Sequence, residues 1–479
     1  MKLSGFMNSV HRLVATVLFF CMVSVSFAAR VKPRAIATTD GEIDDLSTMV
    51  RFLMYSCDYE VVGIIQNNSR YQKSGHSKDR ADHLNPKGTY KGAWFPVMIE
   101  GYKKVYPQLI KHHPDYPTAE YLTSVMRIGN ENPSDLYVEP AEMKTKNTEG
   151  EQLIVKIMTD DDPREVHISC WGGSNTVASA LYTIKYSGKY SEDQIKKALA
   201  KVRIYCIWYQ DGGGKWIDTN VKEAFIFEAY RWENIWDYQS YDGSFKGRPS
   251  SNPKDVQEYM KPVWLNSNVR ENHGALGMLT PQHWISEGDT PSWLHLVNNG
   301  LESHTDYTIG GWGGRGVYDD KAKKPNHITD KRLKEDGDAN KHYWRWVIAA
   351  QNDFAARADW CVKDYDKANH APVAAFNGST VDDFPIVKID AMPGQTINLD
   401  ATGSKDPDNN TLSYEWWVYK EIGTYGRDVE IKNATSKKAT MTIPADTNDK
   451  TVHVILEVTD NGEPSLKGYR RAIIDVEKD

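Results

Sequence analysis

Three aspartates lie in a short stretch near the start of the chain, TTDGEIDDLSTMVRFL. Asp40 follows the β-like run from Arg34 to Thr39, and Asp44 and Asp45 stand where the next helix should begin. The carboxyl end of a strand and the amino end of the following helix meet at the ligand-binding edge of an open α/β sheet. Carboxylates so close together need a counter-ion, and Ca²⁺ suits them because it takes about six to eight oxygen ligands. The segment therefore predicts a metal site, unless Asp44 is only a helix N-cap and Asp45 only a partner of the helix dipole.

Two later motifs could contribute to the same site. In VHISCWGGSNTVASAL an apolar strand ends at a Gly-Gly turn, which lets a ligand approach the backbone, so the carbonyl of Trp171 could face the site. In SEGDTPSWLHL, Asp289 stands just before Thr290 and Pro291, a pattern typical of a helix start. Both motifs also have a structural explanation, since Gly-Gly followed by Asn175 closes many strand-to-helix loops and Asp289 could be an N-cap.

The elements that would position these residues alternate between β-like and helical patterns. Apolar residues from Leu46 to Met54 follow helical spacing between the first strand and a buried strand at Val61 to Ile65, which makes a βαβ unit. Such alternation predicts an α/β fold with a doubly wound, mostly parallel sheet and helices on both faces. Further helices are expected at Ala93–His112, Thr118–Ile128, Asn175–Tyr186 and near Val221–Trp232, and further strands at Val166–Trp171 and Val202–Tyr209.

The pattern changes after about residue 370. The stretch from Asn369 to Pro372 looks like a linker, and the short alternating runs INLDA, LSYEWWVY, ATMTIPA and VHVILEVTD follow it between turn residues. Short alternating strands of this kind are typical of an all-β, immunoglobulin-like sandwich. We therefore expect an α/β domain at residues 30–368 and a β-sandwich domain at residues 371–479.

The first residues predict an export signal at 1–28. Lys2 and Arg12 supply positive charge, Leu13 to Phe27 is apolar, and small residues end at Ala28 and Ala29, where we expect cleavage. The rival interpretation is a retained membrane anchor, but the apolar run is short for a spanning helix. The processed chain should then lack a membrane segment and reside in the periplasm or outside the cell.

The composition favours a globular protein that does not bind nucleic acid. Hydrophobic residues make up 40% and charged residues 26% of the chain, close to globular averages. Removing Lys2 and Arg12 with the signal would change the formal charge from −7 to −9, so phosphate-backbone binding would lack its electrostatic driving force. Four cysteines survive processing without a CxxC spacing, and Cys170 and Cys206 lie in apolar runs, which favours buried thiols over a disulfide or metal site.

The motifs resemble those of known proteins. The sequence TDGEIDD after a strand resembles the DxDPGxDD signature of nucleoside hydrolases, and CWGGSNTVASAL resembles their Gly-rich loop and Thr-Asn helix start. A closer resemblance covers nearly the whole processed chain and is carried by EGDTPSWLHLVNNGL, GGWGGR and GSKDPDNNTLSYEWWVYKEIGTY. It is to a family of secreted bacterial proteins, often labelled cellulose-binding, that join a nucleoside-hydrolase-like domain to an Ig-like C-terminal domain.

This resemblance implies roles for individual residues. Asp40 would bind Ca²⁺ and activate a water molecule, and Asp44 would hold sugar hydroxyls. Asp45, the carbonyl of Trp171 and Asp289 would complete the metal shell. Cleavage of a glycosidic bond needs a positioned water and oxygens that hold the ring hydroxyls, so Asp40 would act as the general base.

Other residues are expected to contact the substrate. The predicted substrate-binding residues include Asn67, Asn68 and Asn175. Large aromatic residues crowd the second half of the α/β region, and most should pack in the core. Trp216 and Trp312 stand beside the Gly-rich loops DGGGKW and GGWGGR, and we predict that they line a cleft.

The chain also departs from the nucleoside hydrolase pattern. Thr38 replaces the first Asp of the signature, and Gly41 and Glu42 replace its Pro-Gly. Gly288 stands where nucleoside hydrolases often carry a His that helps the leaving base depart. Three residues could supply an acid from elsewhere: His273, His283 and Asp211.

The sequence thus predicts a secreted, calcium-dependent glycoside hydrolase that cleaves a ribosyl or other furanosyl-like linkage of a glycan or nucleoside-like molecule. The alternative is a non-catalytic protein that binds cellulose or another glycan on the same scaffold. Thr38, Gly288 and the β-sandwich favour that alternative.

Overall fold

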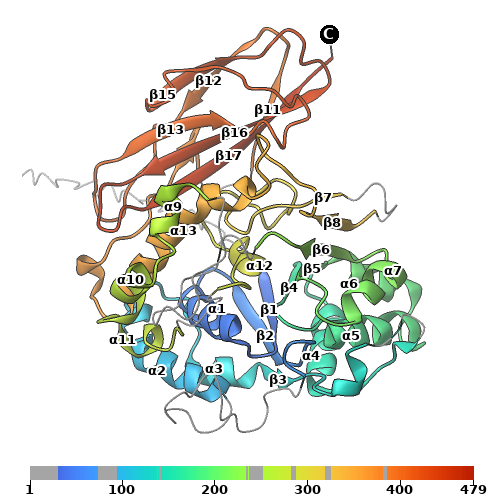
Figure 1. Ribbon diagram of the computed structural model, residues 1–479. Helices are drawn as coiled ribbons and strands as arrows, with labels where there is room; N and C mark the ends of the chain where they lie inside the picture. The colour runs from blue at the N-terminus through green and yellow to red at the C-terminus, as the bar shows by residue number, and fades with distance from the viewer. Residues whose placement is uncertain are drawn as a thin grey trace, which may run out of the picture. The chain divides into compact units, whose positions relative to one another are not determined.

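A large sheet with helices on both faces and a set of smaller sheets make up the computed structural model (Figure 1). It describes residues 31–73, 94–137, 139, 142–232, 236, 252–281, 287–318, 325–380 and 386–478. The predicted export signal at 1–28 lies outside these residues. Within them, no helix combines the length and the apolar character needed to cross a membrane.

The large sheet contains eight strands in the order β3-β2-β1-β4-β5-β6-β8-β7. Neighbouring strands are parallel, except that β7 runs antiparallel to β8. This mostly parallel sheet confirms the predicted α/β fold. Its strands are β1 (Arg34–Thr39), β2 (Glu60–Gln66), β3 (Met126–Ile128), β4 (Val166–Cys170), β5 (Val202–Ile207), β6 (Phe225–Ala229), β7 (Val317–Tyr318) and β8 (His327–Thr329).

Helices cover both faces of this sheet because successive side chains of a strand point to opposite faces. Ala35 and Ala37 of β1 join the apolar core that contains α1, α2 and α13, whereas Ile36 joins the core that contains α4 to α7 (Figure 1). The main helices are α1 (Ile43–Met54), α2 (Trp94–His112), α3 (Ala119–Ser124), α4 (Glu149–Met158), α5 (Asn175–Tyr186), α6 (Glu192–Ala200), α7 (Gly213–Asn220) and α13 (Lys341–Trp360). Shorter ones are α9 (Lys254–Glu258), α10 (Pro262–Leu265), α11 (Gly274–Gly277) and α12 (Pro291–Leu294).

The C-terminal strands form the predicted sandwich-like sheets. One has the order β11-β17-β16-β13 and another β12-β15-β14, while β9 and β10 pair separately. Alternate residues of these strands build a third apolar core around Trp416. The strands are β9 (Ala375–Phe376), β10 (Ser379–Thr380), β11 (Val387–Ala391), β12 (Thr396–Asp400), β13 (Ser413–Val418), β14 (Ile431–Lys432), β15 (Lys438–Thr442), β16 (Lys450–Thr459) and β17 (Lys467–Val476).

Buried polar contacts join these strands to the α/β region. The guanidinium of Arg471 on β17 donates to the carbonyls of Leu301, Ile309 and Gly310 at 2.7–2.9 Å, and it is fully buried. Residues Lys32–Asp479 accordingly form one compact unit. The boundary that we expect between residues 368 and 371 remains a prediction.

Two predicted helices are wrong in part or in whole. The pattern at Thr118–Ile128 gives a helix only to Ser124, after which Met126–Ile128 pairs with β2. The segment near Val221–Trp232 contains β6 rather than a helix. Its run FIFEA is aromatic and β-branched, and it packs between β5 and β8, so the sheet overrides the helix-forming residues around it.

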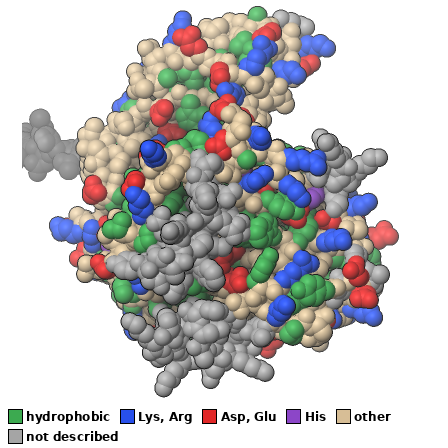
Figure 2. Space-filling model, in the orientation of Figure 1, with side chains coloured by type: hydrophobic (Ala, Val, Ile, Leu, Met, Phe, Trp, Pro, Cys, Tyr) green, Lys and Arg blue, Asp and Glu red, His purple; other side chains and the backbone are tan. Residues whose placement is uncertain are grey.

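Many charged side chains lie on the surface, and the described cysteines lie in the interior. Figure 2 shows acidic and basic side chains interspersed over one face of the molecule rather than gathered into a basic stripe. The four cysteines of the described region are free and buried, as their apolar surroundings predict.

The sandwich contains a buried histidine that should make the fold sensitive to acid. Burial, and secondly the positive charge of Arg471, lower the pKa of His453 from 6.5 to about 3. The unfolded chain therefore binds more protons between these pH values, so stability should fall as the pH drops through this range. In urea denaturation, the unfolding free energy of the wild type should fall more steeply than that of His453→Gln, by up to about 1.4 kcal/mol per pH unit. Parallel pH profiles would contradict this account.

Candidate functional site

Four buried carboxylates meet at the carboxyl edge of the large sheet. Asp40 directly follows β1, Asp44 and Asp45 lie in the first turn of α1, and Asp289 precedes α12. Asp44, Asp45 and Asp289 each offer one oxygen, and these three oxygens lie within 4.8 Å of one another. Because Asp289 comes from a segment about 240 residues away in sequence, only the folded sheet brings the group together.

Repulsion among the buried carboxylates of this cluster favours the binding of a cation. Burial, followed by the charge of Asp40, raises the pKa of Asp44 to about 7. Burial and the charges of neighbouring carboxylates raise the pKa of Asp45 and of Asp289 well above 3.8. Both carboxylate oxygens of Asp289 are buried and accept no hydrogen bond from a described residue. A bound cation would satisfy these oxygens and remove the repulsion, so the donor set fits a metal ion.

Local hydrogen bonds orient Asp40 and Asp45. Asp45 Oδ1 accepts from Thr39 Oγ1 at 2.5 Å and from the backbone N–H of Asp40 at 3.1 Å. Asp40 Oδ1 accepts from the backbone N–H of Glu42 at 3.2 Å. The N-cap of α1 is Glu42, so Asp44 does not have the N-cap role that the sequence left open. Gly41 has a φ of 71°, a region that favours glycine, and this turn delivers Asp44 and Asp45 to the sheet edge.

Two glycines make room for the carboxylates. A Cβ on Gly172 would lie 2.5 Å from Asp40 Cγ. A Cβ on Gly288 would lie 2.4 Å from Trp232 Cζ3 and 2.6 Å from Asp44 Oδ2. The indole of Trp232 therefore fills the space that a histidine at 288 would need, which gives the departure at this position a physical reason.

Several predicted substrate and metal contacts lie on the loops around the cluster. The carbonyl of Trp171 accepts from Gln210 Nε2 at 2.6 Å, while its indole packs against Phe52 in the core. Asn67 donates to the carbonyl of Gly173, and Asn175 donates to that of Asp135, both at 2.7 Å.

The amide oxygens of these asparagines differ in their surroundings. Those of Asn67 and Asn175 are buried and accept no hydrogen bond from a described residue, which leaves acceptors for a ligand hydroxyl. The amide oxygen of Asn68 is not among these buried acceptors, and its amide nitrogen donates to the carbonyl of Lys73. Thr38, which replaces an acidic residue of the signature, also has a buried hydroxyl oxygen without a described partner.

The two tryptophans predicted to line a cleft are packed in cores. Trp216 is 2% exposed and contacts the rings of Tyr182 and Tyr186 on α5. Trp312 is 1% exposed and contacts Tyr469 of β17. The described ring partners of both indoles are therefore tyrosines of α5 and β17 rather than residues of the carboxylate cluster.

The candidate acids have different locations. Asp211 lies close to the cluster's glycine loop, where it accepts from Ser174 Oγ and the backbone N–H of Asn175 at 2.8 Å. Burial raises the pKa of Asp211 to about 6. His273 contacts Asp359 instead, and His283 lies outside the described residues.

A buried ion pair, which the sequence did not predict, joins the two segments that carry the carboxylates. Arg51 of α1 contacts Glu287 at 2.6 Å, and both side chains are fully buried. Thr48 and Thr290 add a hydroxyl contact of 3.1 Å between the same two segments. The pair therefore fixes the helix that carries Asp44 and Asp45 against the loop that carries Asp289. The sequence signal for this ion pair was Arg51 itself, because a charged residue among the apolar positions of a helix needs a buried partner.

The fold and the acidic site define a nucleoside-hydrolase-like protein with an added C-terminal β-sandwich. The family described as cellulose-binding Sde182, nucleoside hydrolase-like domain, matches residues 34–316. The family described as cellulose-binding protein Sde0182, C-terminal domain, matches residues 396–476. The chain belongs to this cellulose-binding Sde182 family, because the first match alone spans more than half of it.

One solved structure with the same fold agrees with this assignment. A nucleoside hydrolase-related hypothetical protein from Saccharophagus degradans, described as associated with carbohydrate metabolism, is 30% identical and has a TM-score of 0.74. The match covers 93% of this chain and all of the other. A PKD domain from the KIAA 1837 protein matches 19% of this chain and 84% of its own, with 25% identity and a TM-score of 0.15. No curated protein matches the chain.

The Arg51–Glu287 pair should be a major contributor to stability. Glu287→Gln leaves the Arg51 guanidinium buried without its negative partner, which typically costs about 3–5 kcal/mol of unfolding free energy. Urea denaturation should show this loss. As a control, Asp193→Asn breaks an exposed pair with Lys197 and should change stability little. Similar midpoints for the two variants would show that the buried pair does not hold the site together.

Proposed function

We propose that this protein is a calcium-dependent glycoside hydrolase that cleaves a ribosyl or other furanosyl-like linkage. The observation that carries the proposal is the buried cluster of Asp44, Asp45 and Asp289, with Asp40 beside it. Structural ion pairs bury carboxylates together with cations, whereas these carboxylates face one another with raised pKa values. Such perturbed groups at the carboxyl edge of a sheet mark functional sites.

Calcium is the proposed ion because the donors are all oxygens. Asp40, Asp45, Asp289 and the carbonyl of Trp171 would hold it, in the arrangement that nucleoside hydrolases imply. When bound, the ion lowers the pKa of a coordinated water and so supplies a nucleophile near neutral pH. Asp44 is within 4.8 Å of the Asp45 and Asp289 oxygens, so it is close enough to share the ion or to hold a sugar hydroxyl beside it.

The side chains of the chain itself would carry the proton and position the sugar. Asp40 takes the proton of the attacking water as general base, and the close approach of Gly172 keeps its carboxylate in place. The amide oxygens of Asn67 and Asn175 accept no hydrogen bond from a described residue, and they accept from the ring hydroxyls of the sugar. With no histidine at 288, Asp211 is the better placed of the described candidate acids, and its pKa of about 6 leaves part of it protonated near neutral pH.

A second candidate function is glycan binding without catalysis. The matched family is described as cellulose-binding, and the Trp232 indole occupies space that an acid at 288 would need. In either case, we infer that the protein is exported after cleavage of residues 1–28. We further infer that residues 30–368 and 371–479 are its two domains.

Calcium should stabilise the folded protein through the carboxylates. At a free concentration of about 100 times its Kd, Ca²⁺ would add about 2.7 kcal/mol to the unfolding free energy. Thermal melting with and without a chelator should show this shift, and Asp289→Asn should abolish it because one buried ligand loses its charge. Asp193→Asn, on the exposed surface, should keep the shift. An equal calcium shift in Asp289→Asn would place the ion elsewhere.

Hydrolysis should release reducing sugar from a panel of nucleosides and furanosyl glycans. Asp40→Asn removes the general base and should lower kcat by about 100- to 10,000-fold, with Asp193→Asn as the unchanged control. No turnover on any member of the panel, or full activity in Asp40→Asn, would reject the hydrolase. Retention on insoluble cellulose without turnover would then support the second candidate.

A further inference from the structure

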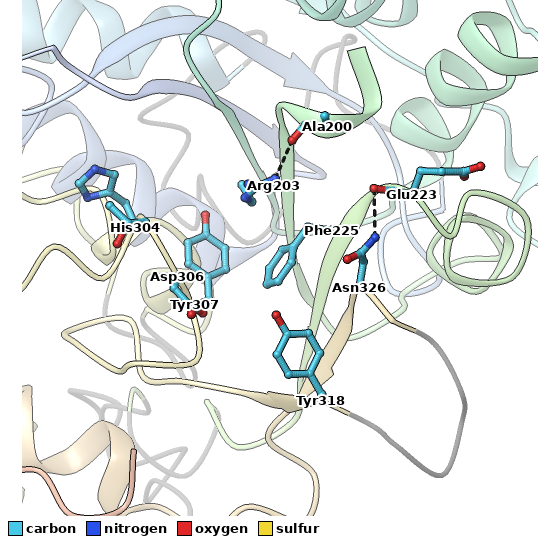
Figure 3. A pocket seen from close by; sticks show the side chains of 10 residues that line it. Ala200, Arg203, Glu223, Phe225, His304, Asp306, Tyr307, Tyr318 and Asn326 are labelled. Atoms are coloured by element: carbon cyan, nitrogen blue, oxygen red, sulfur yellow. Dashed lines mark hydrogen bonds between the residues drawn. The ribbon is translucent and has the colours of Figure 1, made fainter. Parts of the chain in front are cut away.

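The side chains drawn in Figure 3 line a cavity of about 380 Å³. This cavity lies at the opposite edge of the large sheet from the carboxylates. Arg203 near the amino end of β5 and Phe225 at the amino end of β6 contribute to it, whereas Asp40 follows the carboxyl end of β1. Since β1, β4, β5 and β6 are parallel, the two sites lie at opposite ends of the strands. A strand rises about 3.3 Å per residue, so the stretch from Arg203 to Ile207 alone separates them by roughly 13 Å.

We propose that this cavity is a second carbohydrate site, which binds a neutral sugar ring of a glucan chain. The inference rests on glycan binding, the second candidate function, and gives it a location. It does not require hydrolysis at the carboxylates.

Aromatic rings form one side of the cavity. Phe225 and Tyr307 meet edge to face with centroids 5.6 Å apart, and Tyr318 on β7 joins them (Figure 3). Tyr318 is 48% exposed, while Tyr307 is buried. A flat ring that is half open to solvent can stack on the apolar face of a sugar and keep its hydroxyl for a hydrogen bond.

Two charged residues of the cavity lining, Arg203 and Glu223, form ion pairs with neighbours, whereas a further one, Asp306, accepts hydrogen bonds from Thr308. Arg203 pairs with Glu165, and Glu223 pairs with Lys185 at 2.7 Å. A ligand with a strong charge of either sign would have to compete with these pairs. The cavity therefore disfavours an anion, because Asp306 would repel it and Arg203 is already paired, while an uncharged ligand leaves both ion pairs intact.

Acceptors remain for the hydroxyls of such a ligand. Asn326 donates its amide to the carbonyls of Lys222 and Glu223, which directs Oδ1 away from them (Figure 3). Asp306 Oδ1 accepts from Thr308, and Oδ2 can accept from a ligand. Partial burial, and secondly the charge of Asp306, raise the pKa of Tyr318, so its phenol stays a donor at neutral pH. The volume lies within the usual range of about 300–1,000 Å³ for a small-ligand site.

Calorimetric titration of the intact protein with cellohexaose tests this site. The wild type should bind, and Tyr318→Ala should bind at least tenfold more weakly because it loses the exposed ring. The matched control is Tyr186→Ala, since Tyr186 is 47% exposed but lies on α5 outside the cavity. Asp193→Asn should also bind as the wild type does, because Asp193 lies on the exposed surface outside the cavity.

A second variant guards against a folding defect in Tyr318→Ala. Ala200 is exposed at the rim, so Ala200→Trp fills the cavity without removing a packed side chain and should weaken binding as strongly. If both cavity variants bind like the wild type, the cavity is not the site, although glycan binding itself would stand. If the wild type does not bind cellohexaose, both the cavity proposal and glucan binding fail, and the hydrolase proposal is unaffected.

Discussion

Carboxylate oxygens of three side chains are buried within 4.8 Å of one another, and their mutual repulsion is the constraint on which the surrounding structure depends. Desolvation alone opposes the ionised form of a carboxylate, and a second carboxylate nearby opposes it further. A protein keeps such an arrangement only if its backbone is held firmly around it. Here the Arg51–Glu287 pair ties α1 to the loop before α12, and the Thr39 hydroxyl and two backbone N–H groups hold Asp45.

The same constraint accounts for small residues at the site. Gly172 lets the β4–α5 loop pass against Asp40, and Gly288 lets the Trp232 indole approach Asp44. A side chain at either position would displace a carboxylate or the indole. The chain therefore differs from the nucleoside hydrolase pattern at 288 because an aromatic ring from the loop after β6 takes the available space, and this alters the chemistry that the leaving group would meet.

The sheet also separates two kinds of surface. Its carboxyl edge concentrates negative charge, where only a cation or a proton relieves the repulsion. Its amino edge carries the cavity, where Arg203 and Glu223 form ion pairs with neighbours and the ring of Tyr318 is exposed. Parallel strands present different ends to the two sites, so a metal-dependent reaction and the binding of a neutral glycan are compatible on one scaffold. The C-terminal strands, held by Arg471, are part of the same compact unit.

Much of this protein could be predicted from its sequence, because the signals are local. The apolar spacing of α1, the buried runs of β1 and β4, and the turn-bounded strands of the tail each follow from a few neighbouring residues. The position of Asp40 after a strand and of Asp44 and Asp45 at a helix start already predicted a carboxylate site. The segment of β6 could not be assigned in this way, because its burial between two strands, rather than its own periodicity, decides its structure. The resemblance already predicted that Asp289 joins Asp45, but only the tertiary structure decided that Arg51 meets Glu287 and that Trp232 fills the space beside Gly288. These contacts join segments that are far apart in the chain, and they exist only because the parallel sheet brings its strand ends to one edge.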